Sequence, residues 1–83
     1  MRLVELFPKG TEQLKQIIEK EIGEVHSIRI NRVYNSVFAV RMYTRLIVRS
    51  SIDNLEKKYG YRLIRIDMLT AELTFRRLDW LKW

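Results

Sequence analysis

Residues 37–49, with the sequence VFAVRMYTRLIVR, decide between a strand and a helix in the middle of this chain. Large apolar side chains alternate there with arginine and tyrosine, and the β-branched and aromatic composition favours a pleated strand. A helical period would instead put Phe38, Met42 and Leu46 on one face and would predict an all-helical fold. We favour the strand, in which the core-facing positions are Phe38, Val40, Met42, Leu46 and Val48.

A second strand is expected before this one, at residues 27–34, and a short loop at Asn35 would join the two as an antiparallel hairpin. Facing residues in an antiparallel pair project to the same side of the sheet, and their two residue numbers add to a constant total. The apolar residues of both strands have mainly even numbers, so this total must be even if they are to share a core. Pairing Tyr34 with Phe38 meets this condition. It predicts Ile30 opposite Met42, and Arg29 opposite Tyr43.

Before the hairpin, the sequence predicts a strand and a helix. Residues 2–7 (RLVELF) are apolar and end at a proline and a glycine, as a strand entering a turn does. Residues 12–22 have apolar side chains at helical spacing, with Thr11 as the expected N-cap and Gly23 as the expected left-handed stop.

After the hairpin, residues 51–59 predict a second helix, which the capping-box spacing of Ser50 and Asp53 begins and Gly60 ends. Residues 61–68 predict a strand with Ile64, Ile66 and Met68 on its core face. The apolar phase then changes, and residues 71–77 predict a further strand with Ala71, Leu73 and Phe75 inward, after a turn at Leu69 and Thr70.

The order of elements predicts a single α+β domain over residues 1–83. It matches a ferredoxin-like split βαβ fold, βαββαβ with an extra C-terminal strand, in which an antiparallel sheet carries two helices on one face. The opposite face of the sheet would then be open to water or to a partner, and it is where we expect a binding site.

Composition excludes several classes of function. The chain has no cysteine and one histidine, which leaves no set of residues for a zinc or redox site, and its three glycines form no phosphate-binding loop. We therefore expect no metal, no cofactor, no small-molecule substrate and no catalytic residue. No apolar run approaches the ~18 residues that span a bilayer. We expect a cytoplasmic protein with no membrane partner.

The charge of the chain is concentrated in its middle. The formal net charge is +6, and residues 26–50 contain five arginines without a single aspartate or glutamate. Guanidinium holds phosphate with two hydrogen bonds and stacks on bases, so an arginine-only segment favours a nucleic-acid partner, DNA or RNA. Pairing with helix acids is the other reading of the same arginines. The predicted nucleic-acid-binding residues are Arg29, Asn31, Arg41, Tyr43, Arg45, Arg49 and Arg65, with Tyr61 beside them.

Two comparisons with known modules limit this expectation. RNA-recognition modules bind single strands on a comparable sheet, but residues 37–45 (VFAVRMYTR) lack the glycine of their RNP signature. The segment FRRLDW at residues 75–80 resembles the basic and aromatic end of RelE-type ribonuclease toxins, whose helices both precede the later strands, unlike those expected here. Binding without catalysis remains the expectation.

The C-terminus supports an alternative function. Trp80 and Trp83 lie within the last four residues, and tryptophan is enriched at the energetic centres of protein interfaces. The alternative is therefore an interaction or assembly module without a nucleic-acid role, a homo-oligomer formed through a sheet edge and this tryptophan tail.

Overall fold

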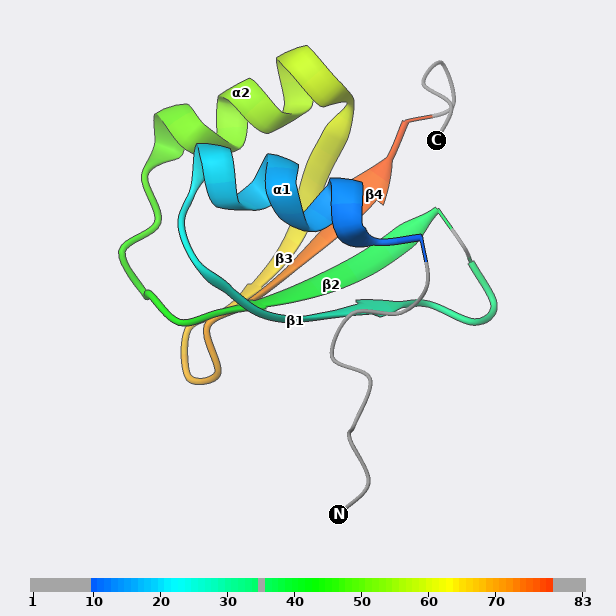
Figure 1. Cartoon of the computed structure of the whole chain (residues 1–83), viewed down its shortest axis with the longest axis horizontal. Coiled ribbons are helices and arrows are strands. Elements are labelled where there is room, and N and C mark those ends of the chain that lie inside the picture. Colours follow the sequence, from blue (N-terminus) through cyan, green and yellow to red (C-terminus); the bar gives the residue numbers. More distant parts are fainter. Residues whose placement is uncertain (1–9, 35, 79–83) are drawn as a thin grey trace.

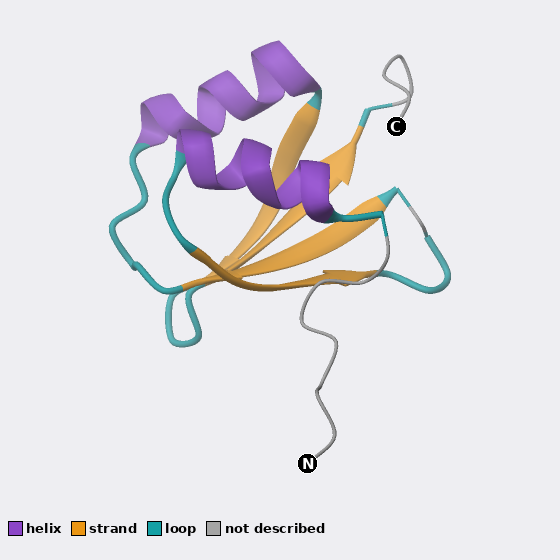
Figure 2. Cartoon of the chain, viewed as in Figure 1, coloured by secondary structure: helices purple, strands orange, loops and turns teal. Residues whose placement is uncertain are grey.

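The computed structural model describes residues 10–34 and 36–78. They form two helices and four strands, coloured along the chain in Figure 1 and by type in Figure 2. In chain order the elements are α1 (Glu12–Glu21), β1 (Val25–Ile30), β2 (Val37–Met42), α2 (Arg49–Tyr59), β3 (Tyr61–Asp67) and β4 (Glu72–Arg77). The predicted strand at residues 2–7 lies outside the described residues.

The strands form one antiparallel sheet in the order β1-β2-β4-β3, and both helices lie on the same face of it (Figure 1). This arrangement confirms the α+β class, the antiparallel sheet and the one-sided helical layer. The strand order does not confirm the ferredoxin-like fold. That fold would put the first strand of the chain between β2 and β3, whereas here β4 occupies this place and pairs with both.

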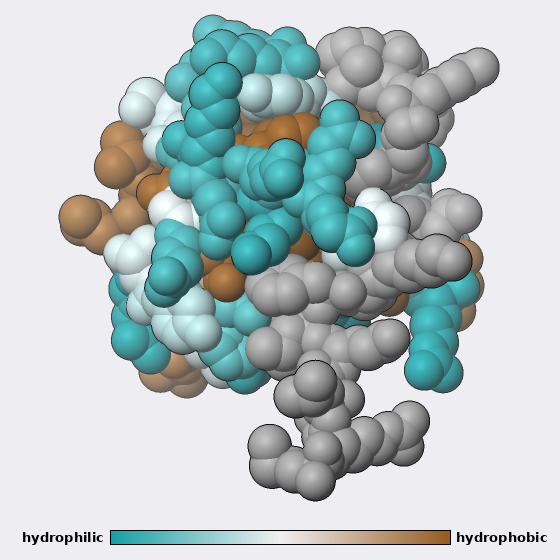
Figure 3. Space-filling model, in the orientation of Figure 1, coloured by the Kyte–Doolittle hydropathy of each residue, from teal (hydrophilic) through white to brown (hydrophobic). Residues whose placement is uncertain are grey.

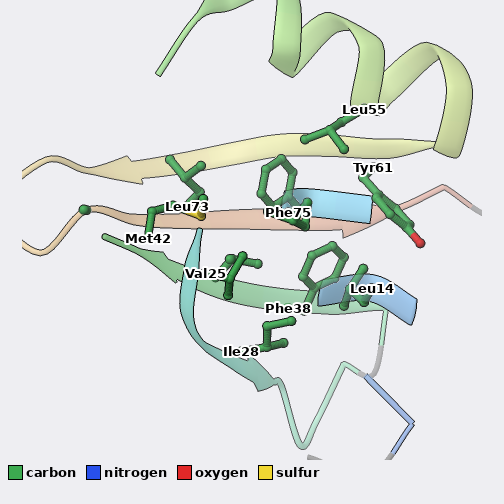
Figure 4. Close-up of a cluster of buried hydrophobic side chains, with 12 residues drawn as sticks. Leu14, Val25, Ile28, Phe38, Met42, Leu55, Tyr61, Leu73 and Phe75 are labelled. Carbon is green, nitrogen blue, oxygen red and sulfur yellow. The ribbon is translucent and has the colours of Figure 1, made fainter. Parts of the chain in front are cut away.

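The core lies between the sheet and the helices (Figure 4). Leu14 of α1 and Leu55 of α2 are buried against Phe38 and Phe75, whose rings stack with centroids 5.5 Å apart. The predicted inward positions of β2 and β4 are confirmed, since Phe38, Val40, Met42, Leu73 and Phe75 are all buried. Both rings are fully buried, so they contribute a large apolar area to the core.

The prediction of one strand over residues 37–49 is wrong beyond Met42. The N–H of Met42 donates to the carbonyl of Ala71, just before β4 begins at Glu72, so β2 has no partner strand farther along. The chain then leaves the sheet as a loop over residues 43–48 and enters α2 at Arg49. Leu46 is consequently 79% exposed rather than part of the core.

The β1–β2 pairs from Ser27 to Ile30 add to an even total, as predicted, but the register differs from the predicted one. Ile30 faces Phe38 instead of Met42, which makes the connection longer than the loop expected at Asn35. The physical reason is Asn31, whose side-chain Oδ1 accepts the backbone N–H groups of Val33 and Tyr34, each at 2.8 Å. This asparagine turn ends β1 four residues earlier than predicted.

The helix ends match the predictions in part. Gly60 ends α2 in the left-handed conformation with φ of 74°, as predicted. Gly23 is not left-handed; α1 ends at Glu21, and its C-cap, Ile22, has right-handed backbone angles. The predicted capping box is also wrong, because α2 starts two residues earlier than expected, with Val48 as its N-cap and no side-chain capping bond.

A bulge changes the faces of β3. The register against β4 shifts between Leu63 and Arg65, which breaks the predicted alternation. Ile66 lies on the helical side, as predicted, because it pairs with the buried Leu73, but Ile64, Ile66 and Met68 are all exposed. Leu63 packs against the core instead. The predicted turn between β3 and β4 is confirmed at residues 68–71.

Tyr61 lies in the core, not on the open face where we expected it. Its side chain is only 7% exposed, and its ring meets the edge of Phe38 at 5.3 Å. This burial raises the pKa of the Tyr61 phenol above its usual 10.0; the charge of Arg77 opposes the rise, and Tyr59 adds to it.

Candidate nucleic-acid interface

The face of the sheet opposite the helices carries side chains in transverse rows, which the strand register defines. The middle row crosses all four strands through Arg29, Ala39, Thr74 and Arg65. Its two outer members are long cations, and its two central members are small. The sequence predicted Arg29 opposite Tyr43, but Arg29 faces Ala39 instead.

Two further rows flank the middle one. One contains Ser27, Arg41, Glu72 and Asp67, and the other contains Val37, Arg76 and Arg62. Both acids of the three rows thus lie in the same row, and the row on the other side of the middle one carries only basic or apolar side chains. The open face is consequently more positive toward the end that holds Arg76.

Each strand contributes an exposed arginine to this face: Arg29, Arg41, Arg65 and Arg76. The Arg29 guanidinium lies 3.4 Å from a carboxylate oxygen of Glu72, a solvent-exposed ion pair of the kind that contributes little to stability. Within the described residues, no carboxylate forms an ion pair with any of the other three. Three of these four arginines are therefore available to a polyanion.

The small central residues leave a hollow of about 460 Å³ on the β1–β2 half of the face. Ala39 and Thr74 lie in the middle row here, and Arg29, Asn31, Arg32 and Val37 are among the other lining residues. A hollow of this size falls within the range of small-ligand sites and can accept a nucleobase. Asn31 lines the hollow, but its carbonyl oxygen is already used by the turn that ends β1.

Tyr43 follows directly after β2 and is 60% exposed. Its ring meets that of His26 edge-on at 5.2 Å, and its N–H donates to the carbonyl of Glu24 at 3.3 Å. These contacts hold the tyrosine beside the row that contains Arg41. One side of its ring system remains accessible for stacking.

Arg45 and Arg49 do not join this face, so these two predicted site residues are corrected. Arg45 donates from Nε to the carbonyl of Met68 at 3.0 Å and from Nη2 to that of Leu69 at 2.8 Å, which ties the 43–48 loop to the β3–β4 turn. Arg49 begins α2, in the helical layer. Both were placed by extending the alternation of β2 past its actual end.

Sequence reasoning missed two arginines of the open face, Arg62 and Arg76. The predicted inward positions of β4 already implied that Arg76 points outward, so its signal was present. Arg62 shares this face with Arg65 only because of the bulge between them, which alternation could not reveal. Its guanidinium lies 3.6 Å from a carboxylate oxygen of Glu56 on α2, at the β3 edge.

The remaining predictions concern groups beyond this face. Trp80 and Trp83, the predicted interface residues, lie outside the described residues. Over residues 10–34 and 36–78, no three histidine or acidic side chains are grouped so as to hold a metal ion. Neither helix in this part of the chain is long and apolar enough to cross a membrane.

Comparison of the chain with protein-family models, with curated proteins and with solved structures found no match.

Proposed function

We propose that this protein binds single-stranded nucleic acid across the open face of its sheet, without catalysis. The observation that carries the proposal is that all four strands present an exposed arginine on this one face, and three of these form no ion pair with a carboxylate in the part of the chain that the structure describes. Arginines that only conferred solubility would not need to gather on one face. Guanidinium groups grip phosphate bidentately and also stack on bases.

The spacing of these arginines suits an extended strand. Neighbouring strands lie about 4.8 Å apart and same-face neighbours along a strand about 6.7 Å apart, so Arg29 and Arg65 are separated by roughly 14 Å across the sheet. A nucleic-acid strand that crosses the middle row would meet a cation on each side and small residues between them. The basic end around Arg76 would favour the phosphates, and the acidic row would repel them.

Bases have two places to bind in this arrangement. The hollow beside Arg29 is large enough for one base, and the exposed ring of Tyr43 offers a stacking platform at the end of β2. Both sites require bases that are not already stacked in a duplex. Both described helices lie on the other face of the sheet, so neither is presented here to enter a groove, which favours a single strand over duplex DNA or RNA.

A salt titration tests the proposal. Fluorescence anisotropy of labelled single-stranded DNA, single-stranded RNA and duplex DNA would be followed over a range of salt concentrations. Four arginine–phosphate contacts predict a slope of roughly −3 for log K against log salt on a single strand. A flat salt response, or stronger binding to the duplex, would refute the proposal.

Matched variants locate the binding surface. Each of Arg41→Ala, Arg65→Ala and Arg76→Ala should reduce the magnitude of the slope by about 0.7 and weaken DNA and RNA alike. Arg49→Ala removes the same charge from the helical layer and should leave the slope unchanged. An equal effect of all four variants would mean that net charge, and not the open face, governs binding.

A further inference from the structure

Among the described strands, β3 lies at an edge of the sheet, with one side unpaired and an apolar border. It is last in the sheet order, and Ile64, Ile66 and Met68 are exposed on it or just after it. A hollow of about 380 Å³ runs beside it. Its lining is apolar along β3 and mixed on the α2 side, where charged residues join the isoleucines: Leu63, Ile66, Met68, Ile47, Ile52, Arg45, Arg49 and Asp53. Figure 3 shows hydrophobic surface gathered on the side where Figure 1 places the β2–α2 connection. An exposed patch of this kind marks an interaction surface.

The free backbone groups of β3 can be identified from its pairing with β4. Arg77 donates its N–H to Ser36, next to β2, and Leu78 donates its N–H to Gly60, next to β3. The even-numbered residues of β4 therefore point their backbone N–H and C=O groups toward β3. Their partners Arg62, Arg65 and Asp67 use their own backbone N–H and C=O groups to pair with β4. By the same alternation, Leu63 and Ile66 direct their N–H and C=O groups toward the open edge.

We propose that this edge pairs antiparallel with the β3 edge of a second copy of the chain, so that Leu63 lies opposite the partner's Ile66 and Ile66 opposite the partner's Leu63. Both residues offer free backbone groups, and both point to the helical side of the sheet. Residues three apart share a face here only because of the bulge between Leu63 and Arg65. In a regular strand this register would bring opposite faces together.

The same register brings opposite charges together. It puts Arg62 beside the partner's Asp67, and two-fold symmetry repeats the contact, so the dimer has two such pairs. Both residues project to the open face of the sheet. A shift by one position would instead put Arg65 against the partner's Arg65. Arg62 also forms an ion pair with Glu56 of its own chain. Both side chains of that pair are exposed to solvent, so it competes only weakly with the contact between Arg62 and the partner's Asp67.

The symmetry fixes the form of the dimer. An antiparallel pair of identical edges has its two-fold axis perpendicular to the sheet, so the two sheets join into one of eight strands. The helical layers then lie together on one side, and the two basic faces lie together on the other. The dimer does not require nucleic acid, so its failure would leave the proposed function intact, and the reverse also holds.

Sedimentation equilibrium over a dilution series, without nucleic acid, tests the dimer. Wild-type protein should have the mass of two chains. Arg62→Asp and Asp67→Arg each turn two attractive cross-strand pairs into repulsive ones, which should weaken dimerisation by roughly 30-fold. Arg32→Asp makes the same charge change at the other edge of the sheet, and it should leave the dimer intact.

Charge exchange separates a specific contact from general destabilisation. An equimolar mixture of the Arg62→Asp and Asp67→Arg variants restores both pairs in a heterodimer, and the double variant Arg62→Asp/Asp67→Arg restores them in a homodimer. Circular dichroism checks that each variant is folded. If one single variant is unfolded, the mass of the double variant alone tests whether charge exchange restores the dimer. Monomeric wild type at every concentration, or a failure of the folded double variant to regain the dimer mass, would overturn the proposal.

Discussion

Replacing Arg45 with alanine should reduce the stability of the fold and leave nucleic-acid binding unchanged. Its guanidinium donates to the carbonyls of Met68 and Leu69 at 3.0 and 2.8 Å, and it is the described side chain that ties the 43–48 loop to the β3–β4 turn through hydrogen bonds. Two such charge-assisted bonds would contribute more if they were buried. Because these are exposed to water, we expect a loss of about 1–2 kcal/mol in the free energy of unfolding.

Urea denaturation followed by circular dichroism measures this loss. A change of about 1–2 kcal/mol corresponds to a fall in Tm of roughly 5–10 °C for a domain of this size. Arg45→Lys should be intermediate, because one ammonium group cannot reproduce the fork that reaches two carbonyls. Arg49→Ala, at an exposed position, should change stability by less than about 0.5 kcal/mol.

The salt slope of nucleic-acid binding gives the second measurement on the same variant. The account predicts that Arg45→Ala keeps the wild-type slope, because its charge is directed to backbone carbonyls. Unchanged stability combined with a reduced slope would refute this reasoning and would return Arg45 to the binding surface.

Three further predictions concern the fold. Gly60→Ala should destabilise the protein by about 1 kcal/mol, because φ at this helix end is 74°, whereas Gly23→Ala should be neutral or slightly stabilising, since its added Cβ would meet Thr44 at an ordinary 3.6 Å; thermal melts compare the two. Phe38→Ala should cost about 3–5 kcal/mol in urea denaturation, since the ring is fully buried. Burial raises the pKa of the Tyr61 phenol, so the stability that the neutral phenol contributes is complete below pH 10.0 and is lost as pH rises through the folded-state pKa. The free energy of unfolding of the wild type should therefore fall more steeply above pH 10.0 than that of Tyr61→Phe. Parallel pH curves for the two proteins would contradict the raised pKa.

Local alternation predicted the centre of the fold well. Phe38, Val40 and Met42 are buried as expected, because a strand paired on both sides has one face against the helices along its full length. The even total was also correct for the β1–β2 pairs from Ser27 to Ile30, although a bulge before Ser27 changes it at Val25. These features depend on a period of two, which the sequence displays directly.

The failures come from features that alternation does not contain. β2 ends where its partner β4 begins, and this pairing is part of the tertiary structure, which local alternation does not report. Arg45 and Arg49 were therefore assigned to a strand that does not reach them. The bulge in β3 put Arg62 on the same face as Arg65, and the Asn31 turn shifted the hairpin register. The predicted site consequently retained Arg29, Arg41 and Arg65. It lost Arg45 and Arg49, and it lacked Arg62 and Arg76.

The side-chain Nε–Hε signals of arginine, followed by NMR during titration with single-stranded RNA, test the central claim most directly, because they report on the guanidinium groups themselves. The account predicts shifts for Arg29, Arg41, Arg65 and Arg76, with the signals of Arg45 and Arg49 unchanged. Unchanged signals for all four open-face arginines at saturating RNA, or shifts confined to Arg45 and Arg49, would contradict it.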